Sequence, residues 1–125
     1  MNFIVTTLGC KVNQYESDAI AQGLENHGWQ RALEGMPVDT CIINTCTVTG
    51  KASMQSRQAI RRLVRAHPKA RIIVTGCYAQ TAPDEIERIE GVHYIVGQFE
   101  KSDIPRLIIE SSPDIASDPV RLVKH

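Results

Sequence analysis

Residues 40–77, TCIINTCTVTGKASMQSRQAIRRLVRAHPKARIIVTGC, contain a complete strand–helix–strand unit. The short apolar run at 40–44 predicts a strand buried on both faces, and residues 71–75 predict a second one. Between them, residues 51–66 carry apolar side chains at the spacing of an amphipathic helix. The pair His67-Pro68 ends this helix, because proline disfavours helical geometry in the residue before it.

The same alternation extends to both sides of this unit. We expect further strands at 3–7, 29–33 and 94–96, and further helices from about 14 to 27, at 83–89 and at 102–110. This order of elements predicts a three-layer α/β domain over residues 1–110, with a mostly parallel five-stranded sheet in a flavodoxin-like or Rossmann-like layout. Residues 111–125 contain two Ser/Asp/Pro clusters and are expected to be a tail or linker.

The composition is that of an ordinary soluble domain. The chain has 125 residues, of which 42% are hydrophobic and 22% charged, and its formal net charge is zero. No apolar stretch approaches the ~18 residues that a membrane span needs. The amino terminus lacks a basic segment followed by a long apolar core, so we expect no secretory signal, no membrane partner and a cytoplasmic location.

Three of the four cysteines follow predicted strands. Cys10 comes after the first strand, Cys46 after the strand at 40–44, and Cys77 after the strand at 71–75. The carboxyl ends of parallel strands share one edge of the sheet, where ligands usually bind. In a flavodoxin-like strand order (2-1-3-4-5) these three strands are neighbours, ~5 Å apart. Three thiolates with an open fourth position suit an iron–sulfur cluster or zinc.

Other interpretations of the cysteines stay open at this point. Without a local CxxC pair they can be unlinked thiols, and Cys41, inside a predicted strand, is expected to be a buried small hydrophobe. Gly9 and Gly76, each directly before a cysteine, permit a tight turn and a close backbone approach. A catalytic thiol would need an activating base. All four histidines are expected at the surface: His27, His67, His93 and His125.

The middle of the chain is basic. No acidic residue occurs between Thr40 and Pro83, where Lys and Arg together contribute seven positive charges. Four arginines of the predicted helix form a ridge, because three are spaced i, i+4, i+8 and the fourth lies beside them. We expect this ridge to be either a solvated face or a contact with RNA phosphates. Its members are Arg57, Arg61, Arg62 and Arg65.

Four motifs resemble those of the methylthiotransferase family, radical S-adenosylmethionine enzymes that install methylthio groups on tRNA adenosines or on a ribosomal protein. Residues 7–17, TLGCKVNQYES, are similar to the family's opening motif. The next three follow in order: IINTCTVT at 42–49, SRQAIRR at 56–62 and VTGCYAQ at 74–80. Residues 11–17 are most similar to the branch that acts on N6-threonylcarbamoyladenosine next to the tRNA anticodon.

The resemblance implies roles for individual residues. It implies that Cys10, Cys46 and Cys77 are the ligands of an auxiliary 4Fe–4S cluster, whose unligated iron binds the sulfur that reaches the product. Asn13 and Asn44 fall inside the same motifs and are expected to line the cluster pocket. For Asn44 the alternative is a strand-end amide that bonds the turn backbone. The implied partners are tRNA and a radical S-adenosylmethionine domain of the same protein.

One departure from the family pattern matters. The four cysteines include no CxxxCxxC motif. S-adenosylmethionine and a second 4Fe–4S cluster would therefore belong to an absent radical domain, and we expect this chain to be an isolated amino-terminal domain. The full-length protein would be a tRNA methylthiotransferase, whereas this chain alone is expected to be inactive. The alternative is a non-enzymatic RNA-binding or protein-docking module that uses the basic helix 51–66.

Overall fold

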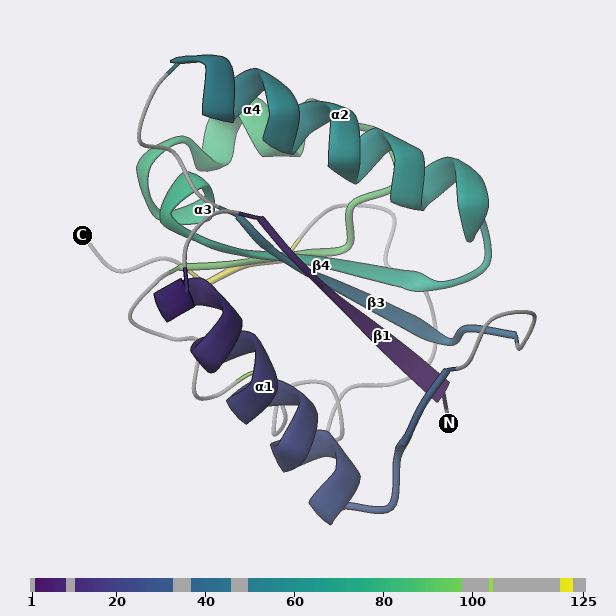
Figure 1. The fold of residues 1–125 in the computed structure, drawn as a ribbon. Helices are drawn as coiled ribbons and strands as arrows, with labels where there is room; N and C mark the ends of the chain where they lie inside the picture. Colours follow the sequence, from purple (N-terminus) through teal and green to yellow (C-terminus); the bar gives the residue numbers. More distant parts are fainter. Residues whose placement is uncertain are drawn as a thin grey trace.

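The computed structural model describes residues 2–8, 11–32, 37–45, 50–97, 104 and 120–122. Within these residues, strands and helices alternate along most of the chain (Figure 1). In chain order the elements are β1 (Asn2–Thr7), α1 (Lys11–Asn26), β2 (Gln30–Arg31), β3 (Thr40–Thr45), α2 (Gly50–Ala66), β4 (Arg71–Gly76), α3 (Cys77–Thr81), α4 (Pro83–Glu87), β5 (Tyr94–Val96) and β6 (Val120–Leu122).

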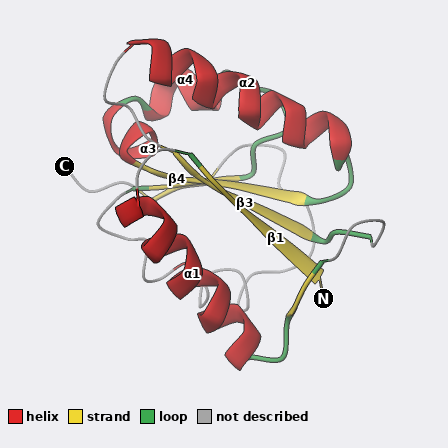
Figure 2. Ribbon diagram, in the orientation of Figure 1, coloured by secondary structure: helices red, strands yellow, loops and turns green. Residues whose placement is uncertain are grey.

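The strands form one sheet in the order β2-β1-β3-β4-β5-β6, and every pairing is parallel. Helix α1 covers one face, and α2, α3 and α4 lie on the other (Figures 1 and 2). This arrangement confirms the predicted three-layer α/β fold and the flavodoxin-like order of the first five strands. The sixth strand, β6, comes from residues expected in the tail. Its three residues are too few to show a periodicity in the sequence.

The two central strands are buried along their whole length. All residues of β3 and of β4 are buried, which agrees with their continuous apolar runs. Their side chains alternate between the two faces. Cys41 and Ile43 pack in the cluster on the α2 side, whereas Ile42 packs with Phe3 and Leu24 on the α1 side. The sheet is thus held from both faces by separate apolar layers.

Several element boundaries differ from the sequence expectations. Helix α1 begins at Lys11, earlier than expected, and the second strand is reduced to Gln30–Arg31. Helix α3 was not expected, because a five-residue helix shows no repeat of apolar positions. Of the helix expected at 102–110, only Ile104 lies among the described residues; it is helical and fully buried in the α1-side cluster. Among the described helices, none is long and apolar enough to cross a membrane.

His93 is buried, which corrects the expectation that all four histidines lie at the surface. Its exposed fraction is 9%. The N–H of Ile72 donates to His93 Nδ1 at 2.9 Å, and the N–H of His93 donates to the carbonyl of Ile72 at 2.9 Å. The side chain therefore completes the β4 backbone pairing just before β5 begins. Burial, and secondarily the charge of Arg71, lowers the pKa of His93 below its ordinary value of 6.5.

Acid should therefore destabilise the domain through His93. The unfolded chain binds a proton at this site near pH 6.5 while the folded chain resists it, so the free energy of unfolding falls as the pH drops below about 6.5. In His93→Asn, an amide oxygen replaces the acceptor without titrating. We expect urea unfolding between pH 7 and pH 5 to show a flatter pH dependence for this variant than for wild type. An equal slope in both proteins would contradict the role of His93, and the exposed His27→Asn serves as the control.

Candidate functional site

The carboxyl ends of β1, β3 and β4 lie side by side. The register pairs Thr7 with Asn44 and Asn44 with Thr75, so these strands end level with one another. Helices α1, α2 and α3 all begin on this side of the molecule (Figure 1). The predicted ligands Cys10 and Cys46 follow β1 and β3 but lie outside the described residues, so only the third cysteine can be placed.

Cys77 is the first residue of α3 and directly follows β4. It is half-buried, and its thiol is free. The Thr81 hydroxyl donates to the Cys77 carbonyl at 3.0 Å, which holds the short helix together. Among the residues that the structure describes, no group of three or more His, Cys, Asp or Glu side chains is placed to hold a metal ion.

Gly76 makes the kind of close backbone approach that a glycine before Cys77 permits. Its φ is 101°, a conformation that side chains rarely allow. A Cβ at this position would lie 2.3 Å from the carbonyl oxygen of Thr45 and 2.8 Å from Asn44 Oδ1. The turn into Cys77 thus presses directly against the end of β3, just before Cys46. Gly9, the other glycine before a cysteine, lies outside the described residues.

A methyl group at Gly76 should be far more costly than one at another glycine of positive φ. Gly28 has a φ of 89° and nothing within 4 Å of its virtual Cβ. Gly28→Ala therefore carries backbone strain alone, about 1–2 kcal/mol. Gly76→Ala adds overlap with the backbone of β3, and we expect a loss of at least ~3 kcal/mol in urea unfolding. Equal losses in the two variants would contradict the close approach.

A buried polar network lies under this edge of the sheet on the α1 side. Thr7 Oγ1 donates to Ser17 Oγ at 2.7 Å, and Asn44 Nδ2 donates to the same oxygen at 3.1 Å. Ser17 and Asn44 are 2% and 0% exposed. The network ties α1 to the ends of β1 and β3, and it involves a serine that the sequence did not single out as a contact. Asn13 belongs to α1, but its side chain lies outside the described part of the chain.

Tyr78, next to Cys77, joins three helices. It is fully buried, and its hydroxyl donates to Glu85 Oε2 at 2.7 Å while accepting a hydrogen bond from Arg57 Nη1 at 3.2 Å. Arg57 and Glu85 also form an ion pair at 3.6 Å. Burial raises the pKa of Tyr78, so the hydroxyl keeps the proton that it shares with Glu85. The cluster of Arg57, Tyr78 and Glu85 thereby fixes α3 against α2 and α4.

Loss of the Tyr78 hydroxyl should weaken this junction. Tyr78→Phe removes hydrogen bonds to two charged side chains, and we expect the free energy of unfolding to fall by about 1–2 kcal/mol. Tyr94→Phe is the matched control, because Tyr94 is half-buried and its hydroxyl makes no hydrogen bond with the described residues. Urea unfolding of both variants checks the prediction. A Tyr78→Phe variant as stable as Tyr94→Phe would contradict it.

The four arginines of the predicted ridge differ in burial and in their contacts. Arg57 is half-buried and held by Tyr78 and Glu85, whereas Arg61, Arg62 and Arg65 are exposed. Spacing along the helix could not reveal this difference, since the partners of Arg57 lie 21 and 28 residues further along the chain. The first arginine of the ridge is therefore part of a structural contact.

Cys41 differs from the other cysteines, as predicted. It is fully buried in the apolar cluster on the α2 side. Burial raises the pKa of its thiol from 9.0 to about 12. A thiol that stays protonated in an apolar layer is neither a ready nucleophile nor a ready metal ligand.

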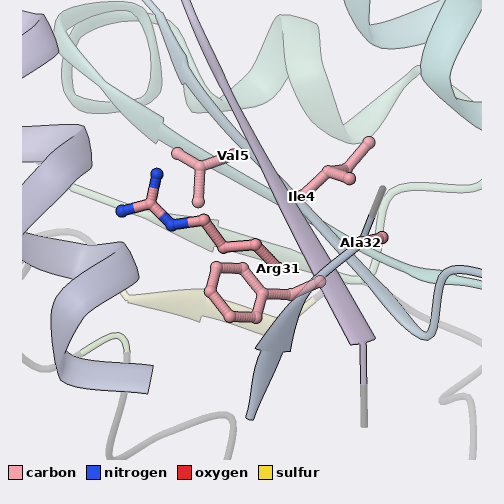
Figure 3. Close-up of a pocket in the computed structure, with 5 residues that line it drawn as sticks. Ile4, Val5, Arg31 and Ala32 are labelled. Carbon is pink, nitrogen blue, oxygen red and sulfur yellow. The ribbon is translucent and has the colours of Figure 1, made fainter. Parts of the chain in front are cut away.

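A small cavity lies elsewhere, beside the amino-terminal half of β1. Its volume is about 180 Å³, and it lies between β1 and the segment that includes β2 (Figure 3). Ile4 and Val5 point to opposite sides of the strand there. The cavity offers no nucleophile or metal ligand, since its lining consists of Phe3, Ile4, Val5, Arg31 and Ala32.

Comparison with known proteins identifies the family. A family model described as uncharacterized protein family UPF0004 matches residues 2–97. Threonylcarbamoyladenosine tRNA methylthiotransferase MtaB of Bacillus subtilis is 52% identical over 91 residues, which are 73% of this chain and 20% of that protein. The MtaB of Aquifex aeolicus is 36% identical over 110 residues, which are 88% of this chain and 27% of that protein.

A relative from another branch is less similar. Ribosomal protein uS12 methylthiotransferase RimO of Chloroflexus aurantiacus is 29% identical over 109 residues, which are 86% of this chain and 24% of that protein. The chain spans between a fifth and about a quarter of the length of these curated relatives. The chain therefore belongs to the UPF0004 family, and within it the MtaB relatives are more similar to this chain than this RimO is.

Proposed function

We propose that this domain holds an auxiliary 4Fe–4S cluster through Cys10, Cys46 and Cys77. In the complete enzyme, that cluster would serve the transfer of a methylthio group to N6-threonylcarbamoyladenosine next to the tRNA anticodon. The names of the MtaB relatives, threonylcarbamoyladenosine tRNA methylthiotransferases, support the substrate. The cysteines, their positions after three strands and the resemblance to the family motifs support the cluster.

The observation that carries this proposal is that the adjacent strands β1, β3 and β4 end at the same edge of the sheet, at paired positions. Thr45 of β3 is paired with Gly76 of β4. Cys46 directly follows Thr45 in the sequence, and Cys77 directly follows Gly76. Cys10 comes two residues after Leu8, whose N–H donates to the Asn44 carbonyl at 2.9 Å. Chain connectivity therefore keeps Cys10 within ~7 Å of the Leu8 Cα, and Cys46 and Cys77 within ~4 Å of their strand ends. Neighbouring strands are ~5 Å apart, so all three thiols can reach one point.

The donor set fits an iron–sulfur cluster. Cysteine thiolates are the usual ligands of such clusters, and soft sulfur ligands select iron–sulfur or zinc over hard cations. When bound through three thiolates, a 4Fe–4S cluster would offer one iron without a protein ligand, where the sulfur to be transferred could bind. Gly76 brings the Cys77 backbone against β3, and Asn44 lies against Gly76. We include Asn44 and Asn13 as residues that line the cluster pocket.

The radical chemistry would belong to another part of the enzyme. This chain has no CxxxCxxC motif, so S-adenosylmethionine and a second 4Fe–4S cluster would bind to a radical S-adenosylmethionine domain. We infer that this chain alone does not catalyse methylthiolation, and that the complete enzyme acts on tRNA in the cytoplasm. The contribution of this chain to the complete enzyme would be to bind and orient the auxiliary cluster.

Anaerobic reconstitution with iron and sulfide tests the cluster. We expect about four irons and four sulfides per chain in wild type, with absorption in the thiolate-to-iron charge-transfer region. Alanine at Cys10, Cys46 or Cys77 should reduce the iron content at least several-fold, because each change removes one of three ligands.

Cys41→Ala is the matched control for these variants. It also removes one thiol, but a buried one, and it should keep the full iron content. A wild-type chain that takes up no iron, or cysteine variants that bind iron as Cys41→Ala does, would overturn the proposal. Zinc without sulfide in the protein as purified from cells, with no iron uptake on reconstitution, would instead support a zinc site.

A further inference from the structure

Helix α2 has an exposed surface outside the proposed cluster site. We define the outward face of α2 as Gln55, Gln58, Arg61, Arg62 and Arg65, all of them exposed. The opposite side of the helix is fixed in the fold: Ser56 and Ile60 are buried, and Ala59, Leu63 and Val64 pack against the core. The direction in which the outward face points is therefore set by the packing of the helix on the sheet.

The charge of this face is uncompensated. The chain has no acidic residue from Thr40 to Pro83. Arg57 is neutralised by Glu85, whereas Arg61, Arg62 and Arg65 form no ion pair with any residue that the structure describes. Three guanidinium groups thus lie within five residues of helix, on its exposed side. Such a concentration of positive charge attracts a polyanion.

The chemistry of the face favours RNA over a protein partner. Arginine forks match phosphate oxygens bidentately, and glutamine amides add neutral hydrogen-bond donors. Protein interfaces are usually centred on apolar or aromatic anchors. Among the described residues of α2 the exposed large apolar side chain is Met54, and it lies one residue before this face begins. From Gln55 to Arg65 the exposed side chains are polar or cationic.

We propose that the outward face of α2 binds the phosphate backbone of tRNA; the identity of the RNA rests on the proposed function. Helix α2 begins at Gly50, on the side of the sheet where Cys46 follows β3. With a rise of 1.5 Å per residue, Arg61 and Arg65 lie ~16 and ~22 Å along the helix from that start. The face therefore contacts RNA backbone at a distance from the adenosine to be modified, and it contributes affinity without reading sequence.

Equilibrium binding of an unmodified tRNA transcript to the whole chain tests this. The variant Arg61→Gln/Arg62→Gln/Arg65→Gln keeps good helix formers on an exposed face and should remain folded, as checked by its urea midpoint. We expect its affinity at low salt to fall by at least ~10-fold. The slope of log K against log salt should shrink by ~2–3, because each lost phosphate contact removes ~0.7–0.9.

Two control variants separate this face from overall charge. The triple Arg→Lys variant keeps three charges and should retain most of the salt slope. Arg31→Gln removes one cation that is paired with Glu25, and it should change the affinity less than Arg62→Gln does. A triple Gln variant that binds like wild type would overturn the proposal. So would an Arg31→Gln effect as large as that of Arg62→Gln, or no wild-type binding at low salt.

The same titration on Cys10→Ala/Cys46→Ala/Cys77→Ala distinguishes this inference from the cluster. Arginine-dependent binding without the cysteines supports the RNA face whether or not wild type takes up iron. Full iron uptake by a chain whose RNA binding does not depend on these arginines overturns the RNA face alone.

Discussion

The parallel pairing of β1, β3 and β4, with their carboxyl ends at the same edge of the sheet, is the constraint on which the rest of the structure depends. Parallel strands need long crossovers, so each of these strands is followed by a helix that returns across the sheet. As a result, every one of these strands ends at the same edge, and whatever follows it in the sequence is delivered there. Gly76 tightens the arrangement, because its missing Cβ lets the turn into Cys77 rest on the Thr45 backbone. The proposed cluster site and the proposed tRNA-binding face of α2 would both depend on this topology.

Side chains next to that edge of the sheet stabilise the positions of the strand ends through hydrogen bonds to the surrounding helices. Ser17 accepts hydrogen bonds from the ends of β1 and β3 on one face, and Tyr78 bonds to α2 and α4 on the other. The three cysteines would then need little reorganisation to bind one group, since the strand ends that carry them are fixed before binding. Arg57 serves this architecture, which leaves the remaining arginines of α2 free for a partner.

Much of the fold was predictable, and the failures have specific causes. The buried runs at 40–44 and 71–75 and the amphipathic pattern of 51–66 identified the central unit, because burial on both faces leaves few polar positions. The sequence did not predict α3 or β6, since elements of five and three residues carry no periodicity. It also misjudged His93, whose side chain replaces a backbone acceptor. At the candidate site, the positions of the cysteines after the strands could be predicted from the sequence. The contacts of Ser17, Tyr78 and Arg57 could not, because they join residues 7 to 28 positions apart on different elements.

The central claim is that Cys10, Cys46 and Cys77 converge on one point, and arsenite binding tests it without iron or sulfide. One As(III) centre bonds to three converging thiols, and each As–S bond formed consumes one thiol and releases one water. In the reduced Cys41→Ala chain, which keeps only these three cysteines, the account predicts about one arsenic per chain and the loss of all three reactive thiols. Full retention of the thiols, or the loss of only two with the third still reactive, would contradict the convergence.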